Sequence, residues 1–318
     1  MVRRGRAAVD VQGLRIGHAE DPARSTGVTV ALFDGGAPVV VDVRGGASAT
    51  FDLASLSLES TFGRRWAVFF SGGSLFGLDA AAGIRDRILE TGGGRSVFRN
   101  PHRIAPVSGA ALFDLPPGNS PIADYRSLGF EAARSAVPGV VQIGKVGAGA
   151  GALVGKYRGR DAAMEGGLGW AGRPLGRRGH LGALVAVNAV GAVRDPSNGR
   201  WVAGARGPGG RIMSPQAHRS SSVPGLGTTL TLIVTDWTLD RPAMQRIAMI
   251  AHSGLGGAIV PFQSATDGDL LFVAATGSEG APPPEDRMGA TADHLGSLAA
   301  ACAVEAVLRA VRISNRKP

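Results

Sequence analysis

The sequence of 318 residues contains a single cysteine, Cys302, so no disulfide framework can form within one chain. Cys302 lies in the apolar stretch 299–304, where a small buried side chain is the preferred interpretation and a nucleophile the less favoured one. A chain without internal disulfides suits a reducing compartment. We therefore expect a cytoplasmic protein.

Long apolar runs are also missing, because none extends over the roughly 20 residues that a membrane-spanning helix needs. The basic start Met1-Val2-Arg3-Arg4 is not followed by the apolar segment that a secretory signal carries. From these two absences we expect the protein to have no membrane partner and no secretory signal.

Several chemical motifs are absent or incomplete. The six histidines show no metal-ligand spacing, and neither His-Glu-x-x-His nor Gly-x-Ser-x-Gly occurs. The run Gly147-Ala148-Gly149-Ala150-Gly151-Ala152 fits a dinucleotide fingerprint, but Gly155 and Gly159 follow at once and disfavour the helix that such a site needs. A phosphate loop ending at Gly155-Lys156 would lack its leading glycine and its final Ser or Thr. We therefore predict no metal and no cofactor.

Acidic residues are in the minority, since 25 acidic against 34 basic residues give a net charge of +9. A basic balance is typical of nucleic-acid binding where basic residues form a patch interleaved with aromatics. Here the basic residues are scattered and aromatics make up only 5%, so we expect an arginine-rich solvated surface and no nucleic-acid partner. Only three lysines occur, Lys145, Lys156 and Lys317. An internal lysine is informative in such a chain, because an ammonium can release its proton and a guanidinium cannot.

A hydrophobic content of 44% and this length suit one folded domain over residues 1–318. Strand patterns occur at 28–33, 39–43, 66–70, 110–113, 181–193, 228–235 and 270–275. Helix patterns occur at 76–90, 123–137, 240–253 (with Asp240 as its cap) and 291–312. We expect the first two strands to form a hairpin through Asp34-Gly35-Gly36. Hairpin-linked strands between helices indicate an α+β protein with mixed sheets covered by helices.

Thr228 begins a strand pattern directly after Gly225-Leu226-Gly227. A threonine at a strand start is ordinary, but a preceding glycine allows strained dihedrals that other residues resist. Attack of Thr228 Oγ on the Gly227 carbonyl, followed by hydrolysis, would release the Thr228 α-amine. Such an amine has an unperturbed pKa of about 7.7–8.0 and can act as general base beside its own hydroxyl. We therefore predict an N-terminal nucleophile and self-cleavage into residues 1–227 and 228–318.

Further polar groups stand where packing alone would not place them. Asn188 interrupts the apolar stretch 184–190, so it is either a structural hydrogen-bonding residue or an oxyanion donor. Lys156 is either a surface lysine or, from its glycine-rich apolar setting, a semi-buried one. Asp267 and Asp269 form an Asp-Gly-Asp turn that is common in loops, or a carboxylate pair that orients an ammonium and the nucleophile.

The turn Ser71-Gly72-Gly73-Ser74 follows a buried strand pattern. Its serines are alternative nucleophiles. The preferred interpretation is that this turn offers backbone N–H groups to a substrate.

Taken jointly and in order, a series of segments gives the chain a wider resemblance. They are Gly45-Gly46, Ser71-Gly72-Gly73-Ser74-Leu75-Phe76-Gly77-Leu78-Asp79-Ala80, Gly147-Ala148-Gly149, Gly155-Lys156-Tyr157, Val187-Asn188-Ala189-Val190-Gly191, Thr228-Thr229-Leu230 and Asp267-Gly268-Asp269. With them the chain resembles, over nearly its whole length, the L-aminopeptidase D-Ala-esterase/amidase family. That family includes β-aminopeptidases and the nylon-oligomer (6-aminohexanoate oligomer) hydrolases.

The resemblance implies a four-layered α-β-β-α sandwich, self-cleavage into two chains that stay together, and a homo-oligomer of these heterodimers, expected to be a tetramer. It implies that Thr228 is the nucleophile and Asn188 the oxyanion or orienting amide. Lys156, Asp267 and Asp269 would form the surrounding charge network.

The residues expected to line the substrate site are Ser71, Gly72, Gly73 and Phe113. The chain departs from the family pattern at two positions. Many members carry Asn where Gly227 stands, and nylon-hydrolysing relatives carry Tyr where Phe113 stands.

The predicted reaction is hydrolysis of an amide bond through an acyl-enzyme on Thr228. The expected substrate is a short peptide or an ω- or β-amino amide whose free amine Asp267 or Asp269 steers. Two alternatives stay open. One is an acyltransferase, because the acetyl-transferring enzymes of arginine synthesis resemble this layered fold and use a self-cleaved Thr. The other, motivated by Gly227, is an uncleaved, non-catalytic binding or structural protein.

Overall fold

The chain folds around one 11-stranded mixed sheet in this computed structural model, which describes residues 4–98, 101–116, 118–176, 179–215, 226–280 and 290–316. The strand order is β1-β9-β12-β13-β16-β18-β3-β5-β8-β4, and β2 also pairs with β3. These strands span Arg4–Val9 (β1), Leu14–Asp21 (β2), Thr26–Val43 (β3), Ala49–Phe51 (β4), Arg64–Ser71 (β5), Val107–Ala111 (β8), Gly139–Gly144 (β9), Gly167–Pro174 (β12), His180–Asn188 (β13), Thr228–Thr235 (β16) and Leu270–Ala275 (β18). Only the β16–β18 and β5–β8 pairings in this sheet are parallel among the described residues.

The remaining elements are four α-helices, short 3₁₀ turns and three small sheets within the described residues. The helices span Ala80–Glu90 (α1), Tyr125–Arg134 (α2), Arg241–Leu255 (α3) and Ala290–Ser314 (α4). The 3₁₀ turns span Ala54–Leu56, Ser74–Asp79, Gly147–Gly149, Lys156–Arg158 and Pro208–Gly210. The small sheets pair Arg95–Ser96 (β6) with Arg103–Ile104 (β7), Leu153–Val154 (β10) with Met164–Glu165 (β11), and Ala192–Arg194 (β14) with Trp201–Ala203 (β15) and Ile259–Val260 (β17).

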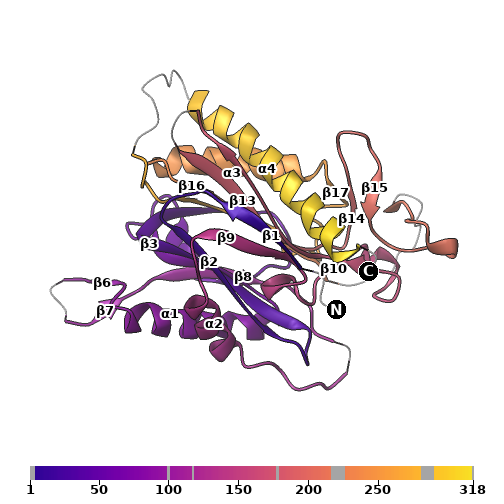
Figure 1. The fold of residues 1–318 in the computed structure, drawn as a ribbon, viewed down its shortest axis with the longest axis horizontal. Coiled ribbons are helices and arrows are strands. Elements are labelled where there is room, and N and C mark those ends of the chain that lie inside the picture. The colour runs from indigo at the N-terminus through magenta and orange to yellow at the C-terminus, as the bar shows by residue number, and fades with distance from the viewer. Residues whose placement is uncertain are drawn as a thin grey trace.

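Three hydrophobic clusters separate four layers in the order α-β-β-α. One cluster lies between α3 and α4 and the part of the sheet that contains β13, β16 and β18. A second lies between the two halves of the sheet and joins Leu232 and Phe272 to Phe33 and Phe70. The third lies between β3 and β5 and the helices α1 and α2. Figure 1 shows α3 and α4 along one outer face and α1 and α2 along the opposite face. The predicted α+β class and the four layers are confirmed.

The predicted hairpin over residues 28–43 is wrong, because one continuous strand, β3, runs through it. Gly35 and Gly36 have φ angles of +71° and +78°, and the register against β5 shifts between Leu32 and Ala37. The glycines therefore bend the strand without reversing it. The first half of β3 pairs with β2 and β5 and the second half with β18, so β3 passes from one sheet layer to the other.

The strands nearest the predicted site agree with the sequence patterns only in part. β16 and β18 have the predicted bounds, but every residue of β16 is buried, where a half-buried strand was expected. Helices cover one face of β16 and the second sheet layer covers the other. The predicted strand 181–193 ends at Asn188, and the chain then enters a separate sheet at Ala192. β8 ends at Ala111, so Phe113 lies beyond the strand.

The helices form where their patterns predict them. The Asp240 side chain caps α3 by accepting a hydrogen bond from the backbone N–H of Ala243 at 2.7 Å. The structure differs at the start of the first helix, because residues 74–79 form a 3₁₀ turn and α1 begins at Ala80.

Helix α4 corrects the expectation about apolar runs. By length and composition alone, its residues Thr291–Ser314 are apolar enough to cross a membrane. However, 56% of its most apolar window is buried inside the structure, where α4 packs on α3, β12 and β13. Its apolar character is that of a core helix in an outer layer of the sandwich.

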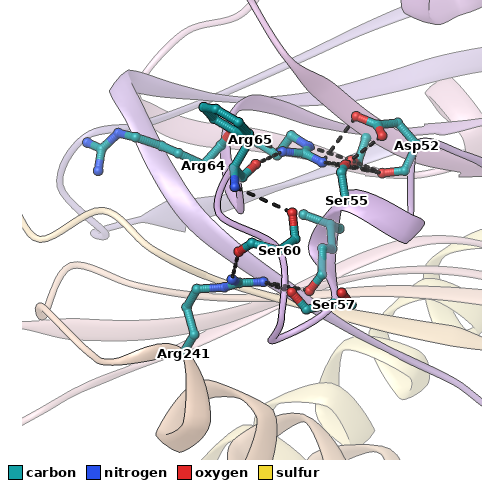
Figure 2. Close-up of polar contacts among 10 residues, drawn as sticks. Asp52, Ser55, Ser57, Ser60, Arg64, Arg65 and Arg241 are labelled. Atoms are coloured by element: carbon teal, nitrogen blue, oxygen red, sulfur yellow. Dashed lines mark hydrogen bonds and ion pairs between the residues drawn. The ribbon is translucent and has the colours of Figure 1, made fainter.

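Two guanidinium groups hold the loop between β4 and β5 (Figure 2). Arg65 is fully buried, pairs with Asp52 at 3.1 Å and donates to the Ser108 hydroxyl at 2.6 Å. Arg241, near the start of α3, donates to the carbonyl oxygens of Leu56, Ser57 and Ser60 at 2.6–2.8 Å. Arg241 therefore links the C-terminal part of the chain to a loop near its beginning.

Candidate active site

Thr228 and Asn188 lie side by side on the inner face of the sheet. They are register partners at the facing ends of β16 and β13. On both strands the even-numbered residues, such as Leu184 and Leu230, pack between the two sheet layers, so the side chains of Asn188 and Thr228 fall on that same face. Both residues are buried. The alternation of the two strands thus places one hydroxyl and one amide in the apolar interior.

The hydroxyl of Thr228 lies against the peptide bond before it, because its Oγ donates a hydrogen bond to the carbonyl oxygen of Gly227. The same carbonyl accepts the backbone N–H of Gly268 at 2.9 Å. The Thr228 hydroxyl and the Gly227 carbonyl are therefore in contact. Residues 216–225, which include Gly225 of the sequence motif, lie outside the described residues.

Gly227 supplies space and not an unusual dihedral. Its φ is not among the positive values of the backbone, so the expected strain is not found there. A Cβ at residue 227 would lie 2.1 Å from Asp267 Oδ1 and 2.4 Å from the backbone nitrogen of Val190. The departure from Asn at this position therefore fits the packing of this chain, since Asp267 occupies the room that a side chain would need.

Asn188 is held from three directions. Its Nδ2 donates to the Phe113 carbonyl at 2.9 Å, and its Oδ1 accepts the backbone N–H of Leu153 at 3.0 Å. Its backbone carbonyl accepts a hydrogen bond from Lys156 Nζ at 2.6 Å. The Nδ2 group has a second N–H, which remains available as a donor beside Thr228.

Lys156 is buried, where the sequence pattern predicted a semi-buried residue. The pKa of its ammonium is lowered to about 7, chiefly by burial and also by the charge of Arg160, while the carboxylates of Asp267, Asp114 and Asp269 oppose the shift. The scarcity of lysine in the sequence singled this residue out. Its position next to Asn188 gives the site an amine that can exist in the neutral form near pH 7.

The carboxylates of Asp267 and Asp269 accept hydrogen bonds from neighbouring groups of the protein. Asp269 accepts the backbone N–H groups of Thr229 at 2.6 Å and Gln263 at 2.8 Å. Asp267 accepts the backbone N–H of Val190 at 3.2 Å and the Ser264 hydroxyl at 2.6 Å. Burial and the neighbouring charge of Asp267 together raise the pKa of Asp269 to about 7, against the lowering effect of its hydrogen bonds. The pair thus fixes the backbone of Thr229, which follows Thr228, and of Val190, which lies just beyond the end of β13.

The turn that follows Ser71 is joined to the site by a hydrogen bond to Asp114. Gly73 donates its N–H to Asp114 Oδ1 at 2.7 Å, while Thr26 donates its hydroxyl to Oδ2 at 2.7 Å. Burial raises the pKa of Asp114, and these hydrogen bonds oppose the shift. The Ser71 hydroxyl is buried without a hydrogen-bond partner among the described residues. Phe113 is half-buried and contacts Asn188 through its backbone.

The sequence patterns missed two groups of this site, Asp114 and Gly268. Asn188 was singled out as a polar residue in an apolar stretch. Asp114 offers a similar signal, because it directly follows the apolar stretch 110–113. Gly268 was noticed only as the spacer between two carboxylates. No group of three potential metal-ligating His, Cys, Asp or Glu residues occurs in the described part of the chain.

Residues 7–316 match the sequence model of Peptidase family S58. The chain belongs to this family. An uncharacterized aminopeptidase of Mycobacterium leprae is 34% identical to it in an alignment of 330 positions, which covers 95% of this chain and 89% of that relative. A 6-aminohexanoate-oligomer endohydrolase of Paenarthrobacter ureafaciens is 30% identical over 313 residues, which cover 95% of this chain and 84% of that relative.

Solved structures show the same fold. A β-aminopeptidase from Burkholderia sp. superposes with a TM-score of 0.62 at 23% identity, over 96% of this chain and 84% of that one. The L-aminopeptidase D-Ala-esterase/amidase of Ochrobactrum anthropi has a TM-score of 0.61 at 18% identity, with the same coverage, and is described as a variant of the Ntn-hydrolase fold. The S58 protein is thus a hydrolase of peptide or amide bonds with an Ntn-hydrolase fold, which favours hydrolysis over the acyl transfer that the sequence left open.

Proposed function

We propose that this S58 protein is a self-processing amidohydrolase whose nucleophile is Thr228. The observation that carries the proposal is the contact between Thr228 Oγ and the carbonyl of Gly227 at the buried start of β16. Such a contact brings the attacking oxygen to the bond that must break before an N-terminal threonine can exist.

In the first reaction, Thr228 Oγ adds to the Gly227 carbonyl carbon and the C–N bond to Thr228 breaks. The proton that leaves Oγ ends on the Thr228 nitrogen, and the product is an ester between Gly227 and the Thr228 side chain. We assign the transfer of this proton to Lys156, because its Nζ is bound to Asn188, the register partner of Thr228, and its lowered pKa leaves a large neutral fraction at neutral pH. Water then hydrolyses the ester and frees the Thr228 amine and the Gly227 carboxylate.

In the second reaction, the freed Thr228 α-amine accepts the proton of its own hydroxyl, and Oγ attacks the carbonyl of an amide substrate. The free N–H of Asn188 Nδ2 lies on the same face of the sheet and supplies a donor for the resulting oxyanion. The buried position of Thr228 supports an order of events in which the Gly227 end must leave before a substrate enters.

The proposed substrates are short peptides or ω- or β-amino amides. The named activities of relatives support this range, because they include aminopeptidases and 6-aminohexanoate-oligomer endohydrolases. We further propose that the two fragments remain one heterodimer and that heterodimers form a homo-oligomer.

Replacement of Thr228 tests the proposal. Thr228→Ala should abolish both self-cleavage and release of amine from peptide amides and 6-aminohexanoate oligomers, whereas Thr228→Ser, which keeps a hydroxyl, should retain some of both. Intact mass and amine release are the two measurements. A Thr228→Ala protein that is processed and active would contradict the mechanism, and faster acyl transfer to ornithine than to water would favour the acyltransferase.

A further inference from the structure

Gly227, the residue before Thr228, is held by two backbone hydrogen bonds to the loop before β18. Gly227 donates its N–H to the Thr266 carbonyl at 3.2 Å, and its own carbonyl accepts the N–H of Gly268 at 2.9 Å. The two hydrogen bonds form an isolated parallel bridge between Gly227 and Asp267. The scissile carbonyl therefore has a fixed orientation relative to one backbone donor.

The absence of a side chain at residue 268 lets the nucleophile approach this donor. A Cβ at Gly268 would lie 2.8 Å from Thr228 Oγ, 3.1 Å from the Ala47 carbonyl oxygen and 3.2 Å from the Ser48 Cα. The φ of Gly268 is not in the left-handed region, so the glycine is required here for space and not for its dihedral freedom. Thr228 Oγ, the Gly227 carbonyl and the Gly268 N–H consequently meet at one point.

The surroundings strengthen such a donor. Thr228, which follows the bridge residue Gly227, is 3% exposed, and Asp267, the other bridge residue, is 1% exposed. Where water is excluded, a preorganised N–H stabilises developing negative charge far more than it does in bulk solvent. Because the neighbouring N–H of Gly227 is already bound to Thr266, the Gly268 N–H is the backbone donor that points at the scissile oxygen.

We propose that the backbone N–H of Gly268 is the oxyanion donor of the self-cleavage step, an inference that rests on the proposed function of Thr228. As the bond from Oγ to the Gly227 carbonyl carbon forms, the carbonyl π electrons move onto oxygen and the Gly268 hydrogen bond shortens onto that charge. When the C–N bond breaks, the electron pair returns to the carbonyl and the Thr228 nitrogen takes up the proton released by Oγ. The Gly268 N–H thus acts during self-cleavage, before any substrate binds.

A pair of variants at one residue separates the N–H from the steric effect of a side chain. Gly268→Ala keeps the N–H and adds a Cβ, whereas Gly268→Pro adds the same Cβ and removes the N–H. Self-cleavage is followed by intact mass against time after refolding. We expect Gly268→Pro to cleave about 100-fold or more slowly than Gly268→Ala, the scale found when one oxyanion donor is lost.

A second variant protects the test against misfolding or a blocked nucleophile in those proteins. Exchange of the residue 268 amide for an ester, by incorporation of glycolic acid, removes the N–H without adding a side chain, and it also weakens the Asp267 carbonyl as an acceptor. The matched control is lactic acid at position 47, because the N–H of Ala47 donates to that same Asp267 carbonyl at 2.9 Å. We expect slow cleavage for the ester at 268 and near-normal cleavage for the ester at 47. Equal rates for these two esters would overturn the inference alone, while a wild-type chain that never cleaves would overturn the proposed function as well.

Discussion

Lys156 illustrates how burial changes the chemistry of a single residue. The sequence identified it through the rarity of lysine and its glycine-rich setting, but a pKa depends on desolvation and on charges that the fold brings together. Arg160 is near Lys156 in the sequence, but Asp114, Asp267 and Asp269 come from distant parts of the chain, so a sequence pattern could not predict their combined effect on the pKa of Lys156.

The rate of self-cleavage should depend on pH through Lys156. Its pKa is lowered to about 7, so the neutral amine becomes more abundant as the pH rises. We expect the rate to increase about tenfold per pH unit below 7 and to level off above it. Lys156→Arg keeps a positive charge that cannot be released, and should cleave very slowly at every pH. Intact mass over time in buffers of equal ionic strength measures both; a flat profile, or a rapidly cleaving Lys156→Arg protein, would contradict this role.

Gly227 should tolerate no side chain. In Gly227→Ala the new Cβ would meet Asp267 Oδ1 at 2.1 Å, so the carboxylate or the scissile peptide must move. We expect self-cleavage at least about tenfold slower, as small misplacements of reacting groups are costly. Gly172→Ala is the control, because the nearest atom to its Cβ would lie at 3.4 Å. Equal cleavage rates for the two variants would show that the space at residue 227 is not needed.

At the scale of elements, the bounds of β16 and β18 followed from their apolar patterns, whereas β3 did not. Asp34-Gly35-Gly36 has the composition of a hairpin turn, and composition alone does not distinguish a reversal from a bend. The distinction depends on the partners of the two halves, β5 and β2 on one side and β18 on the other. Those pairings are distant in sequence and become visible only in the fold.

Arg241 should stabilise the docking of α3 against the loop between β4 and β5. It donates hydrogen bonds to three backbone carbonyl groups there (Figure 2). Removing one charged donor from three partly buried or exposed carbonyl groups should lower the free energy of unfolding by about 1–2 kcal/mol in Arg241→Ala. Arg246→Ala on the exposed face of the same helix is the matched control. Denaturant unfolding measures both, and equal stabilities would contradict the role of Arg241.

At the scale of the whole molecule, the segment after Thr228 lies in the middle of the sheet. β16 pairs with β13 on one side and with β18 on the other, and β18 pairs in turn with β3. The two strands that fragment 228–318 contributes to the large sheet, β16 and β18, therefore lie between strands of fragment 1–227. The sequence placed the cut before a strand, but the central position of that strand is a property of the topology.

The cleaved fragments should consequently stay together. Separation would break three strand pairings of the described residues, β13–β16, β3–β18 and β14–β17, and expose the core beneath α3 and α4. We expect both fragments to elute in one peak from a size-exclusion column in native buffer, at the volume of the uncleaved Thr228→Ala protein. Separate elution without denaturant would contradict this arrangement.

The conversion of Thr228 into an N-terminal nucleophile is tested by the intact mass of the purified protein under denaturing conditions. We expect two polypeptides, residues 1–227 and 228–318, with Thr228-Thr229-Leu230 at the start of the smaller one. A single chain of 318 residues that persists at neutral and alkaline pH would contradict this expectation.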